Sequence, residues 1–506
     1  MDFSPVRLIF TLENRGVISD VGGHTDLSRL CRRISLSKQT SELSISSNGT
    51  MAKLIQQSSI ALSLVVASFC AGQIFAQDVD SVDQENARRS RVVYVDPPVA
   101  VEPGIDPVFP ELSVTVDPEQ DPDYQSRSQA IADYDRAIEV IEREGGAWDQ
   151  NLVEQLTAIG DLQVLQNDHV GAIASFERAM HVNRINDGLH TLRQVNVVER
   201  MIDSHLLLGN WEQADQYNNY LFYVQQKAYG LNDPRIIPVL NRLGNWNIQA
   251  FNLGYGDYLG LRLSNAQTLF TAAALMVGMH FGRDDERFVP YLRNIASSAY
   301  LVSKNPQYIV ALDQTDYRYS QDMLRESMSE ANRTNPRGYT VGKQALTDIV
   351  EYYKQESDST YALAEAIANL ADWELLFAHR NDAADLYAEA WQLLAANDGA
   401  EELLPRLFGQ VLLLPTFSDR PVNLALGSEE ALNRSELTAD YVEFRFDVTE
   451  YGAVRNVEVL SEETAANNRQ FMQLSRVLRE SRFRPVLEEG LPKGSQGHVF
   501  RYRYWY

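Results

Sequence analysis

The stretch LTAIGDLQVLQNDHVGAIASFERAM (residues 156–180) has the pattern of two helices joined by a tight turn. Small residues recur in it at helical spacing: Gly160 in the first half, and Ala172 and Ala179 in the second. Small residues let two helices approach closely, because they leave room for a larger side chain from the partner helix. Phe176 is the aromatic residue that we expect to fill this room. The stretch therefore predicts a helical hairpin with small and aromatic residues at its interface.

The same arrangement recurs twice along the chain. The segment LLLGNWEQADQY (206–217) carries Gly209 in its turn, followed by Trp211 and Ala214. In the segment ANLADWELLFAHRNDAADLYAEAWQLL (368–394), the corresponding residues are Ala371, Ala383, Tyr387 and Ala390. These units resemble the tetratricopeptide repeat family, although the first unit lacks the Trp and Tyr that the family has in its first helix. The resemblance implies an α-solenoid whose concave face binds peptides or protein segments.

A second internal duplication lies between these units. YGLNDPRIIPVLNRL (229–243) aligns with FGRDDERFVPYLRNI (281–295), and both copies have an aromatic residue and a glycine, followed by Asp, Arg and Pro. Asp is a good helix N-cap and Pro is tolerated in the opening turn, so each copy is expected to begin a new helix pair. The apolar run 269–281 is too short to span a bilayer and predicts a buried repeat helix. Residues 302–360 are less regular, and we assign them no repeat register.

Near the C-terminus the pattern changes from helical to alternating. YVEFRFDV (441–448) puts apolar residues on one face, which is typical of a half-buried strand. A turn at Gly452 leads to a return strand, AVRNVEVL, and apolar residues between 471 and 478 then recur at three- and four-residue steps, as in an amphipathic helix. Pro485 ends that helix, and the last strand is HVFRYRYWY (498–506). The predicted order is strand, strand, helix, strand.

This segment, about residues 440–506, resembles the C-terminal domain of the TonB energy-transducer family. The strand VEFRFDV, the turn and strand YGAVRNVEVL, then RFRP, EEGLP and VFRYRYW follow the order of the family pattern. The resemblance implies a periplasmic domain that binds partners by adding an extended segment to a sheet edge. The candidate edge residues lie on the last strand: Val499, Arg501, Arg503 and Trp505. The sequence departs from the family in two places: there is no clear Tyr-Pro motif before the first strand, and the leader lacks the Ser and His spaced along an anchor helix that family members use to engage a proton-driven motor.

The leader MAKLIQQSSIALSLVVASFCAGQIFAQDVD (51–80) has the layout of a secretory signal peptide. We expect translation to begin at its first Met, so that residues 1–50 are an over-extended start, and the mature chain to begin at Gln77. The alternative is that the leader is kept as an inner-membrane anchor, although its apolar run is at the short end for spanning a bilayer. Both cysteines, Cys31 and Cys70, precede the expected cleavage point, so the mature chain would contain no disulfide.

Charge and composition narrow the classes of function. The chain has 506 residues and a formal net charge of −24, which argues against a nucleic-acid-binding surface, because such a surface needs a basic face. From Asp440 to the C-terminus there are ten basic and ten acidic residues, so the acidity lies outside this module. We expect the two parts to meet different partners. The histidines show no zinc-pair spacing and no nucleophile motif is present, so we expect no catalytic residue, metal or cofactor.

The predicted fold class is mainly α: a tetratricopeptide-type α-solenoid followed by a small α+β (ββαβ) module like the C-terminal domain of TonB. The predicted parts are a signal peptide at 51–76, an acidic Pro-rich linker at 77–125, a repeat array at 126–412, a linker at 413–438 and the C-terminal module at 439–506. The predicted function is a non-enzymatic periplasmic scaffold of the Gram-negative cell envelope. Its expected partners are proteins or extended peptide segments, outer-membrane proteins among them, with no nucleic acid and with membrane contact only if the leader is retained. The alternatives are a membrane-anchored TonB-like transducer for outer-membrane transport, and an envelope enzyme or enzyme activator.

Overall fold

The computed structural model describes residues 92–101, 121–230, 232–256, 258–309, 337–356, 360–417, 424–425, 437–462 and 467–506. All of these belong to one compact unit of the chain, Val82–Tyr506. The start extension and signal peptide expected at 1–76 lie outside the described residues, as do parts of both expected linkers. Within the described ranges, no helix is both long enough and apolar enough to cross a membrane.

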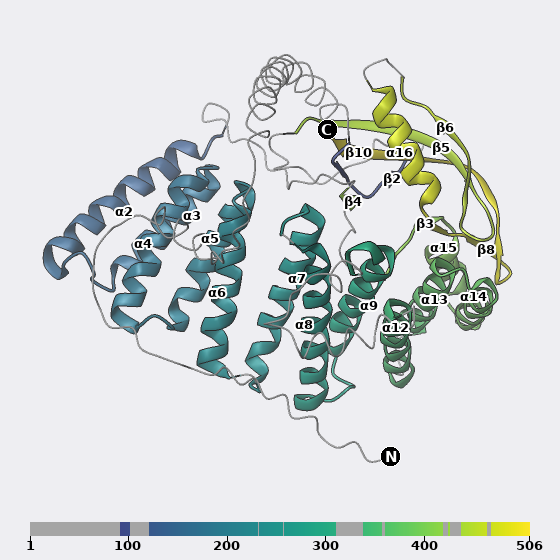
Figure 1. Cartoon of the computed structure of the whole chain (residues 1–506), viewed down its shortest axis with the longest axis horizontal. Helices are drawn as coiled ribbons and strands as arrows, with labels where there is room; N and C mark the ends of the chain where they lie inside the picture. The colour runs from purple at the N-terminus through teal and green to yellow at the C-terminus, as the bar shows by residue number, and fades with distance from the viewer. Residues whose placement is uncertain are drawn as a thin grey trace, which may run out of the picture. The chain divides into compact units, whose positions relative to one another are not determined.

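The helices follow one another as packed pairs (Figure 1). After α2 (Tyr124–Gly145), the pairs are α3 (Leu152–Leu165) with α4 (His169–Asp187), α5 (Val195–Leu207) with α6 (Trp211–Tyr229), α7 (Ile237–Leu253) with α8 (Leu259–His280), α9 (Phe288–Lys304) with α12 (Arg337–Gln355), and α13 (Thr360–Leu376) with α14 (Arg380–Ala395). The short helix α15 (Ala400–Phe408) follows the last pair. The chain is therefore a mainly helical protein built from consecutive helix pairs.

Glycines opposite aromatic rings set the close approach within these pairs. A Cβ atom on Gly160 of α3 would lie 2.3 Å from the ring of Phe176 on α4, which is fully buried. The same arrangement joins Gly244 of α7 to Phe270 of α8, where the distance would be 2.5 Å. Because any larger residue would collide with the ring, glycine is the residue that fits at these positions.

The other packing residues predicted from the sequence lie mostly in helix interfaces. Those at most 1% exposed are Ala172, Ala179, Ala214, Ala371, Ala383, Tyr387 and Ala390. Trp211, the first residue of α6, is partly exposed. Gly209 lies in the turn before α6 with φ 72°, a conformation that glycine adopts without strain.

In both copies of the duplicated motif, the Asp binds the Arg two residues later. The backbone N–H of Arg235 donates to Asp233 Oδ1 at 2.9 Å, and that of Arg287 donates to Asp285 Oδ1 at 3.0 Å. The guanidinium groups bind the same carboxylates, and these hydrogen bonds lower the pKa of both Asp side chains to about 2. Helices α7 and α9 begin directly after these residues, which confirms that each copy starts a new helix pair.

The C-terminal module is an antiparallel sheet with one helix packed against it (Figure 1). Its long strands are β5 (Ala439–Val448), β6 (Val454–Val459) and β10 (Ser495–Trp505), and its helix is α16 (Asn468–Glu480). Apolar side chains of α16 share one core with the inner faces of β5 and β10. Two short strands, β8 (Val486–Glu488) and β9 (Leu491–Lys493), form a further hairpin around the EEGLP turn. The predicted sequence of strand, strand, helix and strand is present, with this hairpin added to it.

The segments expected to be linkers contain short strands that their sequence pattern does not predict. Strands β1 (Tyr94–Val95) and β2 (Val99–Ala100) come from the Pro-rich segment, and β4 (Leu424–Ala425) comes from the segment after α15. With them the strand order of the sheet is β4-β1-β10-β5-β6, and β2 also pairs with β10. Strand β3 (Leu412–Leu413) pairs with β7 (Phe483–Arg484). Segments from both sides of the repeat array therefore complete the C-terminal module.

Candidate functional site

Strand β10, predicted from the sequence as an open docking edge, is paired on both sides. Strand β5 lies on one side of it, and β1 and β2 lie on the other. Three backbone N–H groups of 92–101 donate to carbonyl oxygens of β10 at 2.7–2.9 Å: Val93 to Trp505, Asp96 to Arg503 and Val101 to Val499. The predicted edge residues, Val499, Arg501, Arg503 and Trp505, all lie on this strand. In the intact chain β10 is therefore not an open edge, because residues 92–101 fill it.

Three of the four predicted edge residues, Arg501, Arg503 and Trp505, also have side-chain partners within the chain. Arg503 Nε donates to Asp96 Oδ2 at 2.7 Å, and both side chains are buried. Arg501 Nε donates to Glu443 Oε1 of β5 at 2.8 Å. Trp505 is 1% exposed and packs among apolar residues that include two of β1 and its flank. In the intact chain, these three side chains, which were expected to meet a partner, instead contact the chain's own segments.

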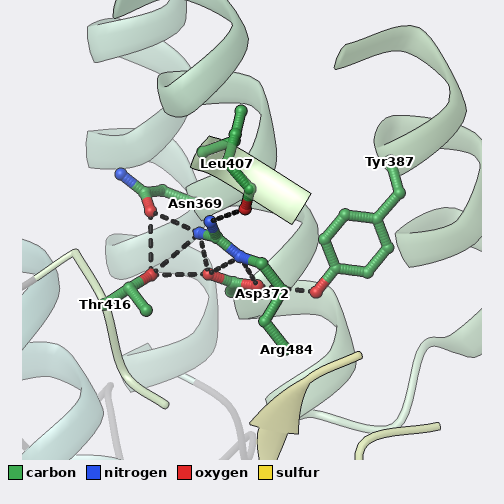
Figure 2. A network of polar contacts seen from close by, with 6 residues as sticks. All are labelled: Asn369, Asp372, Tyr387, Leu407, Thr416 and Arg484. Atoms are coloured by element: carbon green, nitrogen blue, oxygen red, sulfur yellow. Dashed lines mark hydrogen bonds and ion pairs between the residues drawn. The ribbon is translucent and has the colours of Figure 1, made fainter. Parts of the chain in front are cut away.

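The module is joined to the last helix pair by a buried polar network centred on Arg484 (Figure 2). Arg484 Nε donates to Asp372 Oδ1 at 3.0 Å, and its Nη2 donates to Asp372 Oδ2 at 2.5 Å. The same Nη2 donates to Asn369 Oδ1 at 3.0 Å and to Thr416 Oγ1 at 3.1 Å. The Tyr387 hydroxyl completes the network by donating to Asp372 Oδ1 at 2.6 Å. Helix α13, strand β7 and the segment before β4 thus share one set of hydrogen bonds.

The network keeps its ionic character although it is closed to water. Arg484 is 2% exposed and Asp372 is fully buried. Burial alone would lower the pKa of Arg484, but the Asp372 charge and its hydrogen bonds raise it above the ordinary value. Burial and the neighbouring Asp372 raise the pKa of Tyr387, so its hydroxyl stays a donor. From the sequence, RFRP was interpreted as a helix stop and as part of the TonB-like pattern, and not as half of an ion pair. An acidic residue inside the apolar run of α13 was the available signal for this pair.

A second buried carboxylate, Glu374, lies at the end of α13. It accepts hydrogen bonds from Lys343 Nζ at 2.8 Å, the Tyr339 hydroxyl at 2.9 Å and His379 Nδ1 at 2.7 Å. Burial raises the pKa of Glu374, but these hydrogen bonds outweigh it and lower the pKa overall. Glu374, His379 and Asp382 have ligand atoms within 4.8 Å of one another, as a metal site would require. The Lys343 ammonium already supplies the positive charge at this carboxylate, so the cluster fits a compensated buried acid better than a metal centre.

The first repeat pair carries a surface pocket of about 470 Å³ on α4, beside the loop that joins α2 to α3. Its lining residues are Ala147, Trp148, Ala174, Glu177, Arg178, Met180 and His181. Trp148 is 49% exposed, and its ring lies 5.1 Å from the His181 ring. A pocket of this size, with an apolar wall and a few polar groups, suits a side chain or a short peptide segment. Trp148 comes two residues after Gly146, which caps the end of α2, and its place just beyond the pair Gly145-Gly146 was the sequence signal for an exposed aromatic residue.

No protein-family model matches the chain, and no curated protein matches it. Among solved structures, BtubC (BKLC) from P. vanneervenii is similar with a TM-score of 0.32 and 12% identity, over 54% of this chain and 92% of that one. A Podosopora anserina protein described as a kinesin light chain with nearly identical TPR-like repeats has a TM-score of 0.29 and 8% identity, over 42% and 92% of the two chains. A circular tandem repeat protein has a TM-score of 0.25 and 12% identity, over 55% and 68%. The helical-repeat architecture assigned to this chain rests on its own packed helix pairs.

Proposed function

We propose that this protein is a non-enzymatic, protein-binding scaffold of the periplasm, and that its helical repeats bind a segment of a partner protein at the α4 pocket. The observation that carries the proposal is Trp148, which is half exposed at an apolar pocket on the first repeat pair. Trp and Arg are the residues most enriched at energetic centres of protein interfaces, and Arg178 lies in the same pocket. A partner segment with one apolar or aromatic side chain and polar flanks fits this lining.

The C-terminal module and the leader support a role in the envelope. The module resembles the C-terminal domain of TonB in its order of elements, and the leader at 51–76 has the pattern of a cleaved signal peptide. The buried Arg484–Asp372 pair ties the module to the last helix pair, so binding surfaces on both would be parts of one scaffold. A mature N-terminus at Gln77 in the soluble periplasmic fraction is the expected result. An intact leader in the inner membrane would favour the anchored transducer instead.

Site-specific photo-crosslinking tests the proposed binding site. A photo-crosslinking amino acid at Ala174, inside the pocket, should capture a defined partner in the source cells. The crosslink should disappear in a Trp148→Ala variant and persist in Trp148→Phe, because phenylalanine keeps an aromatic face there. The matched control places the same probe at Glu351, an exposed residue of α12. Equal capture from Glu351, or a crosslink that is unchanged in Trp148→Ala, would contradict the proposal.

A further inference from the structure

Residues 92–101 belong to the segment before the repeats, yet they complete the sheet of the C-terminal module. Tyr94 lies opposite Trp505 and Val95 opposite Tyr504, in antiparallel register. The backbone of Val92 also exchanges two hydrogen bonds with the Gln473 side chain of α16, at 3.1 and 3.2 Å. The chain therefore supplies its own strand to β10.

Burial shows how completely this segment is docked. Each residue from Val92 to Asp96 is at most 8% exposed. The side chains of Val92 and Val95 belong to the core of the module, whereas Val93 and Tyr94 pack with Trp505. The strand is thus buried on both faces, and its acidic end is fixed by the Arg503–Asp96 ion pair.

The opposite edge of the sheet, β6, is poorly suited to receive an added strand. Asn456, in the middle of β6, has φ 50°, and the pairing register of β5 and β6 shifts between Arg445 and Asp447. The Asn456 side chain donates to Asp447 Oδ2 at 2.7 Å, which stabilises this irregular geometry. Bulges of this kind protect sheet edges from strand addition. Of the two edges of the three long strands β10, β5 and β6, the outer side of β10 is therefore the one suited to receive a strand, and β1 and β2 occupy it.

We propose that β10 is a strand-docking site whose occupant in the intact chain is the segment 92–101, and that an outside protein binds there only after this segment has left. The occupant defines the kind of partner that fits: an extended segment with the order apolar, apolar, aromatic, apolar, acidic. The carboxylate is the selective element, because it must reach Arg503 as Asp96 does. This inference goes beyond the α4 pocket, and its failure would leave the proposed function standing.

The test compares the intact chain with two opened forms of it. The intact form begins at Gln77, and the first opened form begins at residue 103 and lacks the occupant. The probe is a fluorescent synthetic peptide with the sequence of residues 90–101, and binding is followed by anisotropy. We expect no binding to the intact chain and saturable binding to the opened chain. Asp96→Asn in the peptide should weaken binding at least tenfold, whereas Ala100→Ser, at an exposed position, should leave it unchanged.

The second opened form is a control for the case in which the truncated chain does not fold. A protease site inserted between residues 110 and 111 is cut after the protein has folded, and the labelled peptide then exchanges with the resident fragment in mild urea. Release of the fragment together with uptake of the peptide supports the proposal. It is overturned if the intact chain binds the peptide as tightly as the opened forms, if neither opened form takes it up, or if the Asp96→Asn peptide binds equally well.

Discussion

Replacing Arg484 with methionine should destabilise the protein by about 3 kcal/mol, at the lower end of the cost of breaking a buried ion pair. Methionine is apolar and of similar length, so the main cost is the Asp372 charge left in a site with no exposed surface. Asp372 would keep its hydrogen bonds from Tyr387 and Thr416, which is why we expect the lower end. The double variant Arg484→Met, Asp372→Leu removes the buried Asp372 charge as well. It should recover at least half of the unfolding free energy lost in Arg484→Met.

Urea unfolding followed by tryptophan fluorescence measures this change, because Trp373 lies next to Asp372 in α13 and is fully buried. The control is Arg476→Met, which removes the ion pair with Glu480 on α16. Both side chains of that pair are more than two-thirds solvent-accessible, at 81% and 67%, so the control should cost less than about 0.5 kcal/mol. The reasoning is refuted if Arg484→Met costs no more than the control, or if the double variant is less stable than the single one.

Three further changes test the packing and the charges. Gly160→Ala places a Cβ 2.3 Å from the Phe176 ring. Thermal unfolding should show a net loss of about 1–2 kcal/mol in unfolding free energy, even though alanine favours the helix more than glycine does. A raised Tm would contradict this packing. Glu374 has a lowered pKa in the folded state, so its charge stabilises the protein above the ordinary carboxyl pKa, and this contribution is lost as the pH falls through the folded value. In urea unfolding, the loss of unfolding free energy caused by Glu374→Gln should therefore be largest at neutral pH and shrink below about pH 4. A loss that does not change with pH would contradict a stabilising role for the Glu374 charge. Gly452→Ala, at φ 67° and with its Cβ 2.1 Å from the Phe483 carbonyl oxygen, should speed hydrogen exchange across the β5–β6 hairpin, and unchanged protection would show that the turn tolerates a side chain.

The helical part was predictable because its signals are local. The small and aromatic positions around Phe176 recur at helical spacing, and the Asp and Arg of the duplicated motif mark helix starts. The alternating strands at 441–448 and 498–506 were visible for the same reason. Each of these patterns is contained within one element or one turn, so tertiary context did not change it.

The strand at 94–95 could not be predicted, because its evidence is not local. VVYV is a short apolar run between charged residues and prolines, and a strand buried on both faces shows no alternation. Its partner on β10 lies about four hundred residues further along the chain. The same holds for Arg484 and Asp372, whose 112-residue separation hides an ion pair that only folding brings together. The prediction placed a docking edge on β10 but did not include residues 92–101, which pair with that strand in the structure.

The most direct test of the closed sheet is a disulfide between residues 99 and 501. Val99 and Arg501 are directly opposed in the β2–β10 pairing, at a spacing that a disulfide can bridge, and the chain from Gln77 onward contains no cysteine. Mass spectrometry of the Val99→Cys, Arg501→Cys variant should show an intramolecular crosslink in the monomer. The control pair, Val99→Cys with Arg445→Cys on β5, should stay reduced. Absence of the first crosslink, or a crosslink formed only between two copies, would contradict a sheet completed by the chain's own segment.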